Sequence, residues 1–283
     1  MQKSCVITTK APNWAPDPSD PCAWLRGTAT LEGGRHSPQI LRLDDAEAVG
    51  EQVAEWLLAS RLADPNLPLG LATGRTMEPV YAALARQFAQ RSAAERQRVR
   101  QQWCSFNLDE YVGLAPRDPR SFAATMASQL VTPLQLEAQS VLLPRGDGGD
   151  PDAEALRYAS LLASKGGLGL QILGIGANGH VGFNEPPCGP GVVCRCVALT
   201  ASTRDANAFA FGGDPDQVPD QAISFGLSEI LNARRILLVA TGRAKAEVLR
   251  RAFEESPTAD LPASWLQGHP DVTVVADAAA LGG

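Results

Sequence analysis

The sequence predicts an α/β fold: a single three-layer α/β/α domain with a mostly parallel, Rossmann-like sheet. Short apolar segments typical of buried strands alternate along the chain with segments of roughly 10–15 residues that have the pattern of helices. This alternation favours parallel strands with helices on both faces, because parallel neighbours need long crossover connections. Neither an internal repeat nor a linker divides residues 39–283, so we expect one domain there.

Residues 1–38 differ from the remainder of the chain. They are rich in proline, contain the Gly33–Gly34 pair and lack a sustained hydrophobic period. The opening residues also lack the continuous apolar stretch of a secretory signal. We therefore predict an irregular N-terminal extension, partly disordered, over residues 1–38.

The first predicted elements after this extension are a strand at 40–43 and a helix capped by Asp44, whose apolar stripe is Val49, Val53 and Leu57. Further strands are predicted for short apolar runs at 67–71, 103–108, 141–143, 168–173, 196–199, 235–240 and 272–276. Further helices are predicted between them, at 78–88, 121–130, 152–164 and 244–254.

The composition excludes several classes of protein. Hydrophobic residues make up 45% of the chain, too many for a disordered protein, but no stretch of about 18 apolar residues could cross a membrane. The net charge of −6 disfavours nucleic acid and acidic membrane surfaces as partners. Six cysteines without an export signal are typical of reduced cytosolic thiols. We expect a cytoplasmic enzyme with a small-molecule substrate, no nucleic-acid partner and no membrane partner; a homo-oligomer is possible.

The first candidate binding segment is Thr73, Gly74, Arg75 and Thr76, between a predicted strand and a predicted helix. Ligands of open α/β sheets bind beyond the carboxyl ends of the strands. A glycine turn at a helix N-terminus lets backbone N–H groups approach an anion. The segment therefore indicates phosphate binding, with a tight turn that binds nothing as the alternative.

Two further candidate segments carry titratable groups. Asp109 and Glu110 directly follow a predicted strand, where they are catalytic carboxylates, a helix cap or a pair of surface acids. Residues 174–179 match the dinucleotide pattern G-x-G-x-x-G, but the prolines that follow oppose the helix which that pattern must open. His180 in this loop, with Glu185 nearby, indicates proton transfer, because a carboxylate can orient the imidazole and raise its basicity.

Basic residues near other strand ends complete the candidate site. Arg204 and Lys245 each lie in a segment that follows a predicted strand. An acidic protein that binds an anionic metabolite needs such a local cluster of cations against its overall negative field.

Segments 106–114 and 176–186 resemble the two characteristic segments of glucosamine-6-phosphate deaminases. The resemblance covers about residues 39–277 in order, with further matches at 199–207, 217–219, 222–224 and 242–245. It implies hydrolytic deamination of glucosamine 6-phosphate to fructose 6-phosphate and ammonia, in amino-sugar catabolism, without a metal or an organic cofactor. Residues 39–283 are then a sugar-phosphate deaminase/isomerase domain.

The resemblance also implies residue roles. Asp109 matches the base that moves a proton between C2 and C1, and His180 matches the ring-opening acid/base, assisted by Glu185 and Asn178. The residues that match the phosphate loop and its two cations are Thr73, Gly74, Arg75, Thr76, Arg204 and Lys245.

Three positions depart from the family pattern. Asn178 stands where many members have Asp, so we expect it to position His180 or a hydroxyl and not to act as a base. Arg75 replaces a small residue of the phosphate loop, and Met77 replaces its usual proline. The extra guanidinium of Arg75 either tightens phosphate binding or fills the site.

Two alternative functions and one alternative site are less compatible with the sequence. A related 6-phosphogluconolactonase typically has Asp-Glu-Arg after the strand, where this chain has Tyr111 third. A non-catalytic sugar-phosphate sensor would lack the acid/base residues and carry a DNA-binding helix pair. A zinc site formed by His180 with Cys188, Cys194 and Cys196 is disfavoured, because C-x-C without a second close pair suits tetrahedral zinc poorly.

Overall fold

The computed structural model describes residues 7–8 and 37–283, so most of the predicted N-terminal extension lies outside the described residues. The main sheet consists of β1 (Ile7–Thr8), β2 (Gln39–Leu43), β3 (Leu69–Leu71), β4 (Ser105–Asn107), β6 (Val141–Leu142), β7 (Leu170–Leu173), β10 (Arg235–Ala240) and β11 (Val272–Asp277). The second sheet consists of β5 (Asp109–Tyr111), β8 (Arg195–Ala198) and β9 (Gln221–Ser224). The α-helices are α1 (Ala46–Ala63), α2 (Glu78–Gln90), α3 (Ala93–Gln102), α4 (Phe122–Met126), α5 (Thr132–Leu134), α6 (Pro151–Ser164), α7 (Ala201–Asn207), α8 (Leu227–Leu231) and α9 (Ala246–Glu254).

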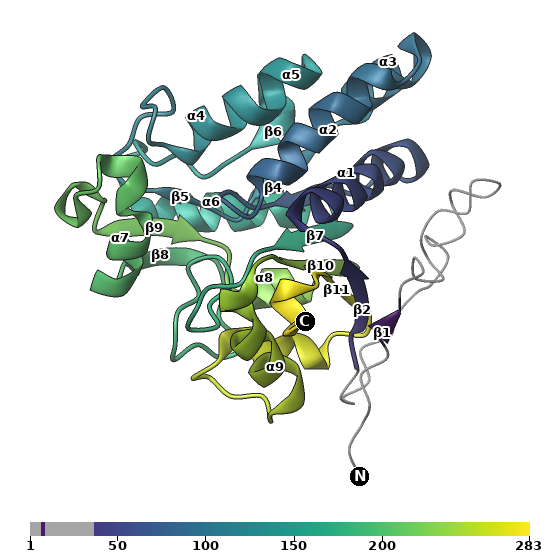
Figure 1. The fold of residues 1–283 in the computed structure, drawn as a ribbon. Coiled ribbons are helices and arrows are strands. Elements are labelled where there is room, and N and C mark those ends of the chain that lie inside the picture. The colour runs from purple at the N-terminus through teal and green to yellow at the C-terminus, as the bar shows by residue number, and fades with distance from the viewer. Residues whose placement is uncertain (1–6, 9–36) are drawn as a thin grey trace.

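The strands of the main sheet follow the order β1-β2-β11-β10-β7-β3-β4-β6, and their neighbours pair in parallel. Figure 1 shows α1, α2 and α3 on one side of this sheet and α8 and α9 on the other. The predicted three-layer α/β/α architecture with a mostly parallel sheet is therefore confirmed. Among the described residues, no helix is long and apolar enough to cross a membrane.

The second sheet is antiparallel, in the order β5-β9-β8, and lies beyond one end of the main sheet (Figure 1). Its strand β8 was predicted from the sequence at 196–199, but as part of the parallel sheet. The strands β5 and β9 were not predicted. Both strands are short, with three residues in β5 and four in β9, and both begin with polar residues. They therefore lack the apolar run from which buried strands are recognised.

The helix predictions need correction at the cap of α1, and they omit α3, α5, α7 and α8. Asp45, and not Asp44, caps α1, since its Oδ1 accepts the N–H of Ala48 at 2.8 Å, three residues along the chain. Helix α3 was not predicted, because Val99 is its one buried residue and it has no apolar stripe. Its start is stabilised by a capping box, in which Ser92 and Glu95 each bind the other's backbone N–H.

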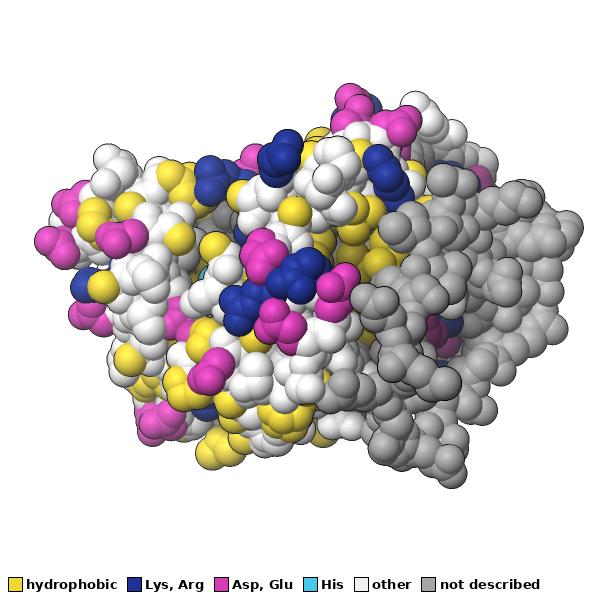
Figure 2. Space-filling model, turned by 60° about the horizontal axis from the view of Figure 1, so that its bottom comes forward, with side chains coloured by type: hydrophobic (Ala, Val, Ile, Leu, Met, Phe, Trp, Pro, Cys, Tyr) yellow, Lys and Arg dark blue, Asp and Glu magenta, His cyan; other side chains and the backbone are white. Residues whose placement is uncertain are grey.

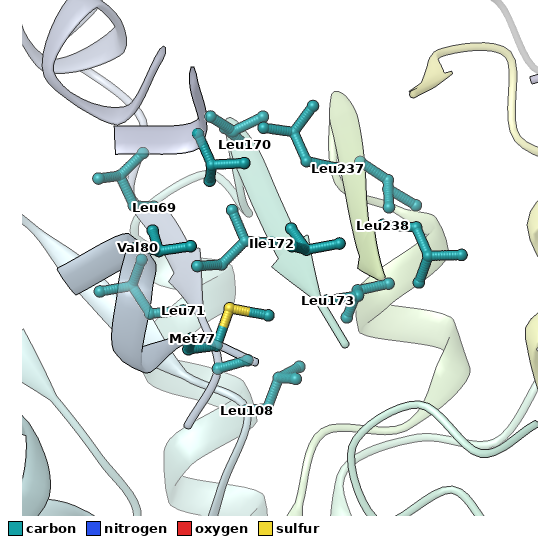
Figure 3. Packing of buried hydrophobic residues seen from close by; sticks show 14 of the residues in the cluster. Leu69, Leu71, Met77, Val80, Leu108, Leu170, Ile172, Leu173, Leu237 and Leu238 are labelled. Atoms are coloured by element: carbon teal, nitrogen blue, oxygen red, sulfur yellow. The ribbon is translucent and has the colours of Figure 1, made fainter. Parts of the chain in front are cut away.

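The core around the central strands is formed by aliphatic side chains on both faces of the sheet. Figure 3 shows Leu71 of β3, Ile172 and Leu173 of β7 and Leu238 of β10 among the buried side chains packed around these strands. Met77 lies among them and is 1% exposed. Its unbranched side chain fills the space beside β3 and β7, which explains how methionine is accommodated at this position.

Some of the exposed charges outside the candidate site form ion pairs. Figure 2 shows basic and acidic side chains interspersed over one face of the molecule. On α9, for example, Arg250 binds Glu247, Glu254 and Glu255. Exposed pairs of this kind contribute little to stability, so the fold depends on its core.

An aromatic cluster joins the two sheets. Tyr158 of α6 stacks on Phe225, with ring centroids 4.7 Å apart, and contacts Phe106 of β4 at 5.4 Å. The Tyr158 hydroxyl donates to the carbonyl of Asn107 at 2.8 Å and to that of Leu142 at 3.0 Å. Helix α6 is thereby fixed at the point where β4 ends and the second sheet begins.

Phe225→Ala should lower the free energy of unfolding by about 3–5 kcal/mol, the usual cost of deleting a fully buried aromatic ring. Phe225 is 0% exposed and contacts both Phe106 and Tyr158. Urea denaturation measures the change, with Leu156→Ala as the control because Leu156 on α6 is 68% exposed. A loss below about 1 kcal/mol in Phe225→Ala would contradict the proposed importance of this cluster.

Candidate active site

The candidate site lies where β3 and β7 pair in the main sheet, with Gly70 opposite Gln171. After β3, the next strand of the main sheet along the chain is β4, which lies on one side of the β3–β7 pair. After β7 it is β10, which lies on the other side. The two connections therefore run in opposite directions along the sheet. Such a switch point is where open α/β sheets bind ligands. The residues 72–77 and 174–185 follow these two strands, and the sequence prediction placed its main candidates in both segments.

The loop after β3 is a turn held at both ends. Gly74 has φ +100°, a conformation that favours glycine, and its carbonyl accepts the N–H of Met77 at 2.8 Å. The hydroxyl of Tyr81, in α2, donates to the carbonyl of Ala72 at 2.6 Å. A Cβ on Gly74 would meet nothing within 4 Å, so the backbone here is open to a ligand at the start of α2.

The two adjacent carboxylates have different environments. Glu110 accepts N–H groups from Tyr111, Phe122 and Ala123 at 2.7–3.0 Å, so it caps the start of α4. Asp109 is 6% exposed, and among the described residues its carboxylate has no hydrogen bond or ion pair. Burial, and then the charge of Glu110, raise the pKa of Asp109 to about 8. The helix-cap alternative is therefore correct for Glu110 but not for Asp109.

Gly182 brings the loop after β7 against Asp109. A Cβ on Gly182 would lie 3.4 Å from Oδ2 of Asp109 and 3.3 Å from the Ser224 hydroxyl. Its φ of +57° also favours glycine. Because Gly182 follows His180 by two positions, this close approach places Asp109 and the His180 loop at the same end of the sheet.

His180 is held over a glycine turn. A Cβ on Gly176 would lie 2.2 Å from the nearest atom of the His180 ring, so any larger residue at position 176 would displace the ring. Residues 174–194 form turns and no helix, as the sequence predicted when it disfavoured a dinucleotide site. Oδ1 of Asn178 lies 2.6 Å from Nδ1 of His180 and also accepts the backbone N–H of His180.

These contacts determine the form of the imidazole. Oδ1 of Asn178 is identified as the oxygen because it accepts the backbone N–H of His180, and an oxygen of this kind can only accept hydrogen bonds. Nδ1 therefore carries the ring proton, which leaves the lone pair on Nε2. Burial, and then the charge of Lys245, lower the pKa of His180 to about 4. The ring is therefore neutral at physiological pH.

Among the hydrogen bonds of the described residues, the contact expected between Glu185 and His180 is not present. Asn178 orients the ring, and the pKa of His180 is lowered by burial. Glu185 instead accepts a hydrogen bond from the Thr200 hydroxyl at 3.1 Å, and Thr200 also caps α7. Proximity in sequence was a poor guide here, because Glu185 lies beyond the turn at Gly182 and contacts a different element.

The predicted cations have separate surroundings. Lys245 donates through Nζ to the carbonyl of Ile175 at 2.7 Å, just after β7. The pKa of Lys245 is lowered, first by burial and then by the charge of Arg75. Arg204 forms an ion pair with Asp220 at 3.1 Å. The charge of Arg75 thus acts on Lys245, whereas Arg204 is bound to an acid.

Some residues of this region were not singled out from the sequence. Asn184 is fully buried, donates to the carbonyls of Val181 and Phe225 at 2.9 Å, and accepts from Arg195. It fixes the loop that follows His180. Phe209 lies under the guanidinium of Arg75, 5.2 Å from it. A buried amide has no sequence signal of its own, and the sequence around Phe209, which also contains Phe211, does not show which of the two rings contacts Arg75.

Cys188 and Cys194 are buried free thiols, and Cys196 is a half-buried one. Within residues 7–8 and 37–283, no cluster of His, Cys, Asp and Glu side chains has the arrangement of a metal site.

The chain is similar to known proteins over most of its length. The model of the family "Glucosamine-6-phosphate isomerases/6-phosphogluconolactonase" matches residues 44–275. A glucosamine-6-phosphate deaminase from Geobacillus sp. (strain WCH70) is 41% identical over 86% of this chain and 94% of its own length. One from Rhodopirellula baltica is 39% identical over 88% of this chain and 96% of its own length.

Solved structures show the same relationship. The structure of a monomeric glucosamine-6-phosphate deaminase is similar with a TM-score of 0.80 and 35% identity, over 86% of this chain and 98% of that protein. A 6-phosphogluconolactonase from Trypanosoma cruzi shares the fold with a TM-score of 0.69 but only 16% identity, over 89% of this chain and 98% of its own. The chain therefore belongs to the family of glucosamine-6-phosphate isomerases and 6-phosphogluconolactonases.

Proposed function

We propose that this protein is a glucosamine-6-phosphate deaminase, which converts glucosamine 6-phosphate and water into fructose 6-phosphate and ammonia. The observation that carries the proposal is the meeting of an unpartnered, buried Asp109 with the His180 loop at Gly182. Aldose–ketose conversion of a cyclic amino sugar needs two separate proton transfers, one at carbon and one at oxygen. The relatives at about 40% identity are named as deaminases, which supports the same reaction.

Asp109 is the proposed base at carbon. It removes the proton from C2 of the opened sugar and returns a proton to C1, while O1 gains a proton and the amine loses one, so that the C2–nitrogen bond becomes an imine that water hydrolyses to the ketone and ammonia. Burial makes the ionised carboxylate a stronger base, because desolvation disfavours its charged form. The absence of a hydrogen-bond partner among the described residues leaves both of its oxygens available to the substrate.

His180 is the proposed acid/base for ring opening. With Nδ1 protonated and bound to Asn178, the lone pair on Nε2 can take the O1 proton of the pyranose and pass a proton to O5. Asn178 keeps the tautomer and the ring orientation but carries no charge. Glu185 accepts a hydrogen bond from Thr200. We propose that it assists ring opening by binding the substrate or a water molecule, and not by direct contact with His180.

The substrate phosphate is proposed to bind the loop Thr73–Thr76 at the start of α2. Backbone N–H groups there, the hydroxyls of Thr73 and Thr76, and the ammonium of Lys245 supply donors for a dianion. An arginine completes this set, and the sequence offers Arg75 and Arg204. The phosphate is remote from the reacting carbons, so its binding aligns them with Asp109 and His180.

Asp109→Asn should lower kcat by at least about 100-fold, as expected for the loss of a general base, while the sugar phosphate still binds. A coupled assay for ammonia and fructose 6-phosphate measures turnover, and calorimetry measures binding. Near-normal turnover in the variant would exclude Asp109 as the base, and an inactive wild-type protein in the same assay would exclude the proposed function.

Glu110→Gln should shift the pH dependence of kcat/KM toward lower pH. We expect kcat/KM to rise with pH as Asp109 loses its proton, because burial and the charge of Glu110 raise the pKa of Asp109 to about 8. Removing the charge of Glu110 lowers that pKa. The amine and phosphate of the substrate titrate identically in both proteins, so the difference between the two profiles reports on Asp109. The exposed Glu137→Gln is the control, and identical profiles for Glu110→Gln and wild type would contradict the assignment.

Lys245→Ala should mainly weaken substrate binding, by about 1.5–3 kcal/mol, as for the loss of a charge-assisted hydrogen bond. The KM for glucosamine 6-phosphate measures this loss, and unphosphorylated glucosamine should be a very poor substrate of the wild-type protein. Equal activity on both sugars would contradict the phosphate site.

A further inference from the structure

Asn184, in the loop after β7, joins separate segments of the chain through its fully buried side-chain amide. Its Nδ2 donates to the carbonyls of Val181 and Phe225, both at 2.9 Å, and its Oδ1 accepts Nη1 of Arg195 at 2.9 Å. The thiol of Cys188 also lies 3.8 Å from Oδ1. A guanidinium only donates and a carbonyl only accepts, so these partners determine which way the amide faces. Both of its N–H groups are thus used within the fold.

The second sheet carries a row of polar side chains on the face of Asp109. In the register of this sheet, Ser224 of β9 lies opposite Asp109 of β5 on one side and opposite Arg195 of β8 on the other. Residues directly opposite each other in antiparallel strands have their side chains on the same face. The hydroxyl of Ser224 also accepts the N–H of Phe183 at 3.3 Å. This face of the sheet therefore holds the loop after β7 at two adjacent residues, Phe183 and Asn184.

Gly182, directly before these two residues, lies against the carboxylate. A Cβ added to Gly182 would lie 3.4 Å from Oδ2 of Asp109. It would also lie 3.3 Å from Oγ of Ser224 and 3.7 Å from Nδ2 of Asn184. Asp109 is only 6% exposed, and the backbone at Gly182 is part of what covers it. The hydrogen bonds of Asn184 therefore bear on how much water reaches Asp109.

We propose that Asn184 is a positioning residue for the proposed base, because its hydrogen bonds keep Gly182 against Asp109 and so keep water from the carboxylate. Arg195 supports this role by binding the amide oxygen. The inference rests on the proposed function, in which Asp109 takes the proton from C2. Asn184 acts through the position of the backbone and not by contact with the substrate.

Asn184→Ala should lower kcat by at least about 10-fold, because a small displacement of the reacting groups is costly even when its cause lies outside them. KM should change by less than about 3-fold, since the proposed phosphate contacts come from other loops. Asn232→Ala is the control, because Asn232 is exposed and its Nδ2 also donates to a backbone carbonyl, that of Ser228 at 2.8 Å. An unchanged kcat in Asn184→Ala would overturn the proposal.

Water admitted beside Asp109 should also move the pH dependence of kcat/KM to lower pH. Burial, and then the charge of Glu110, raise the pKa of Asp109 to about 8, and reduced burial lowers it. In Asn184→Ala the midpoint should fall by at least about half a pH unit. The other titratable groups around Asp109 are Glu110 and Tyr111 of β5 and Tyr158 of α6, and the variant alters none of them. The substrate titrates identically in both proteins, so a midpoint equal to that of wild type would contradict the inference.

Arg195→Met separates positioning from charge, and it tests the same contact if Asn184→Ala does not fold. Loss of a positive charge on this face of the sheet raises the pKa of a carboxyl, whereas loss of support for Asn184 admits water and lowers it. We expect the midpoint to fall, and Arg195→Lys should restore it, because a single nitrogen of Arg195 makes the contact. Arg100→Met is the control, since Arg100 is half-buried and likewise binds oxygens of a carbonyl and an amide, in Leu134 and Gln135. A midpoint that rises or stays unchanged in Arg195→Met would contradict the supporting role.

Nuclear magnetic resonance separates this inference from the proposed reaction. The ¹³C signal of the Asp109 carboxyl, identified by its loss in Asp109→Asn, gives the pKa without turnover. Asn184→Ala and Arg195→Met should lower this pKa whether or not the protein deaminates the sugar. If the wild-type protein lacks deaminase activity but the variants show this decrease, the reaction is wrong and the positioning role stands. If the protein is an active deaminase and the pKa of Asp109 is the same in wild type and both variants, the inference is wrong.

Discussion

The pairing of β3 with β7 is the constraint on which the rest of the candidate site depends. A Cβ on Gly70 would lie 2.2 Å from Oε1 of Gln171, so the side chain of Gln171 packs directly over the backbone of β3. The pairing keeps the two strands in one register, with Leu69 opposite Leu170. Because the two strands are parallel, their carboxyl ends lie at the same edge of the sheet, and the loops that follow them open there. The phosphate loop and the His180 turn meet there for that reason.

Burial then gives the two titratable groups complementary properties. Removal from water disfavours whichever form is charged, so the same cause raises the pKa of Asp109 to about 8 and lowers that of His180 to about 4. Glu110 is buried too, but three backbone N–H groups stabilise its charge and assign it to the start of α4. Glu110 thus has a structural role, whereas the adjacent Asp109 has the proposed chemical role.

The second sheet connects the chemistry to the proposed phosphate site. Asp109 begins β5, which pairs with β9, and Asp220 directly before β9 holds Arg204 of α7. Around this sheet, Tyr111 contacts the rings of Phe122, Phe183 and Phe211. The 3₁₀ helix Ala208–Phe211, which carries Phe209, is packed into this cluster through Phe211.

The sequence by itself determined the layer architecture, most helices and strands of the main sheet, and the segments in which the candidate residues lie. Periodicity and turn residues suffice for these features because they depend on local backbone preference and on burial of one face. The tertiary structure alone decided which side chains act together. Glu185 is separated from His180 and bound by Thr200, Arg204 is paired with Asp220, and Phe209 lies under Arg75. Contacts between segments that are distant in sequence, and the desolvation that sets the pKa of Asp109 and His180, arise only when the strands are assembled, so no local pattern encodes them.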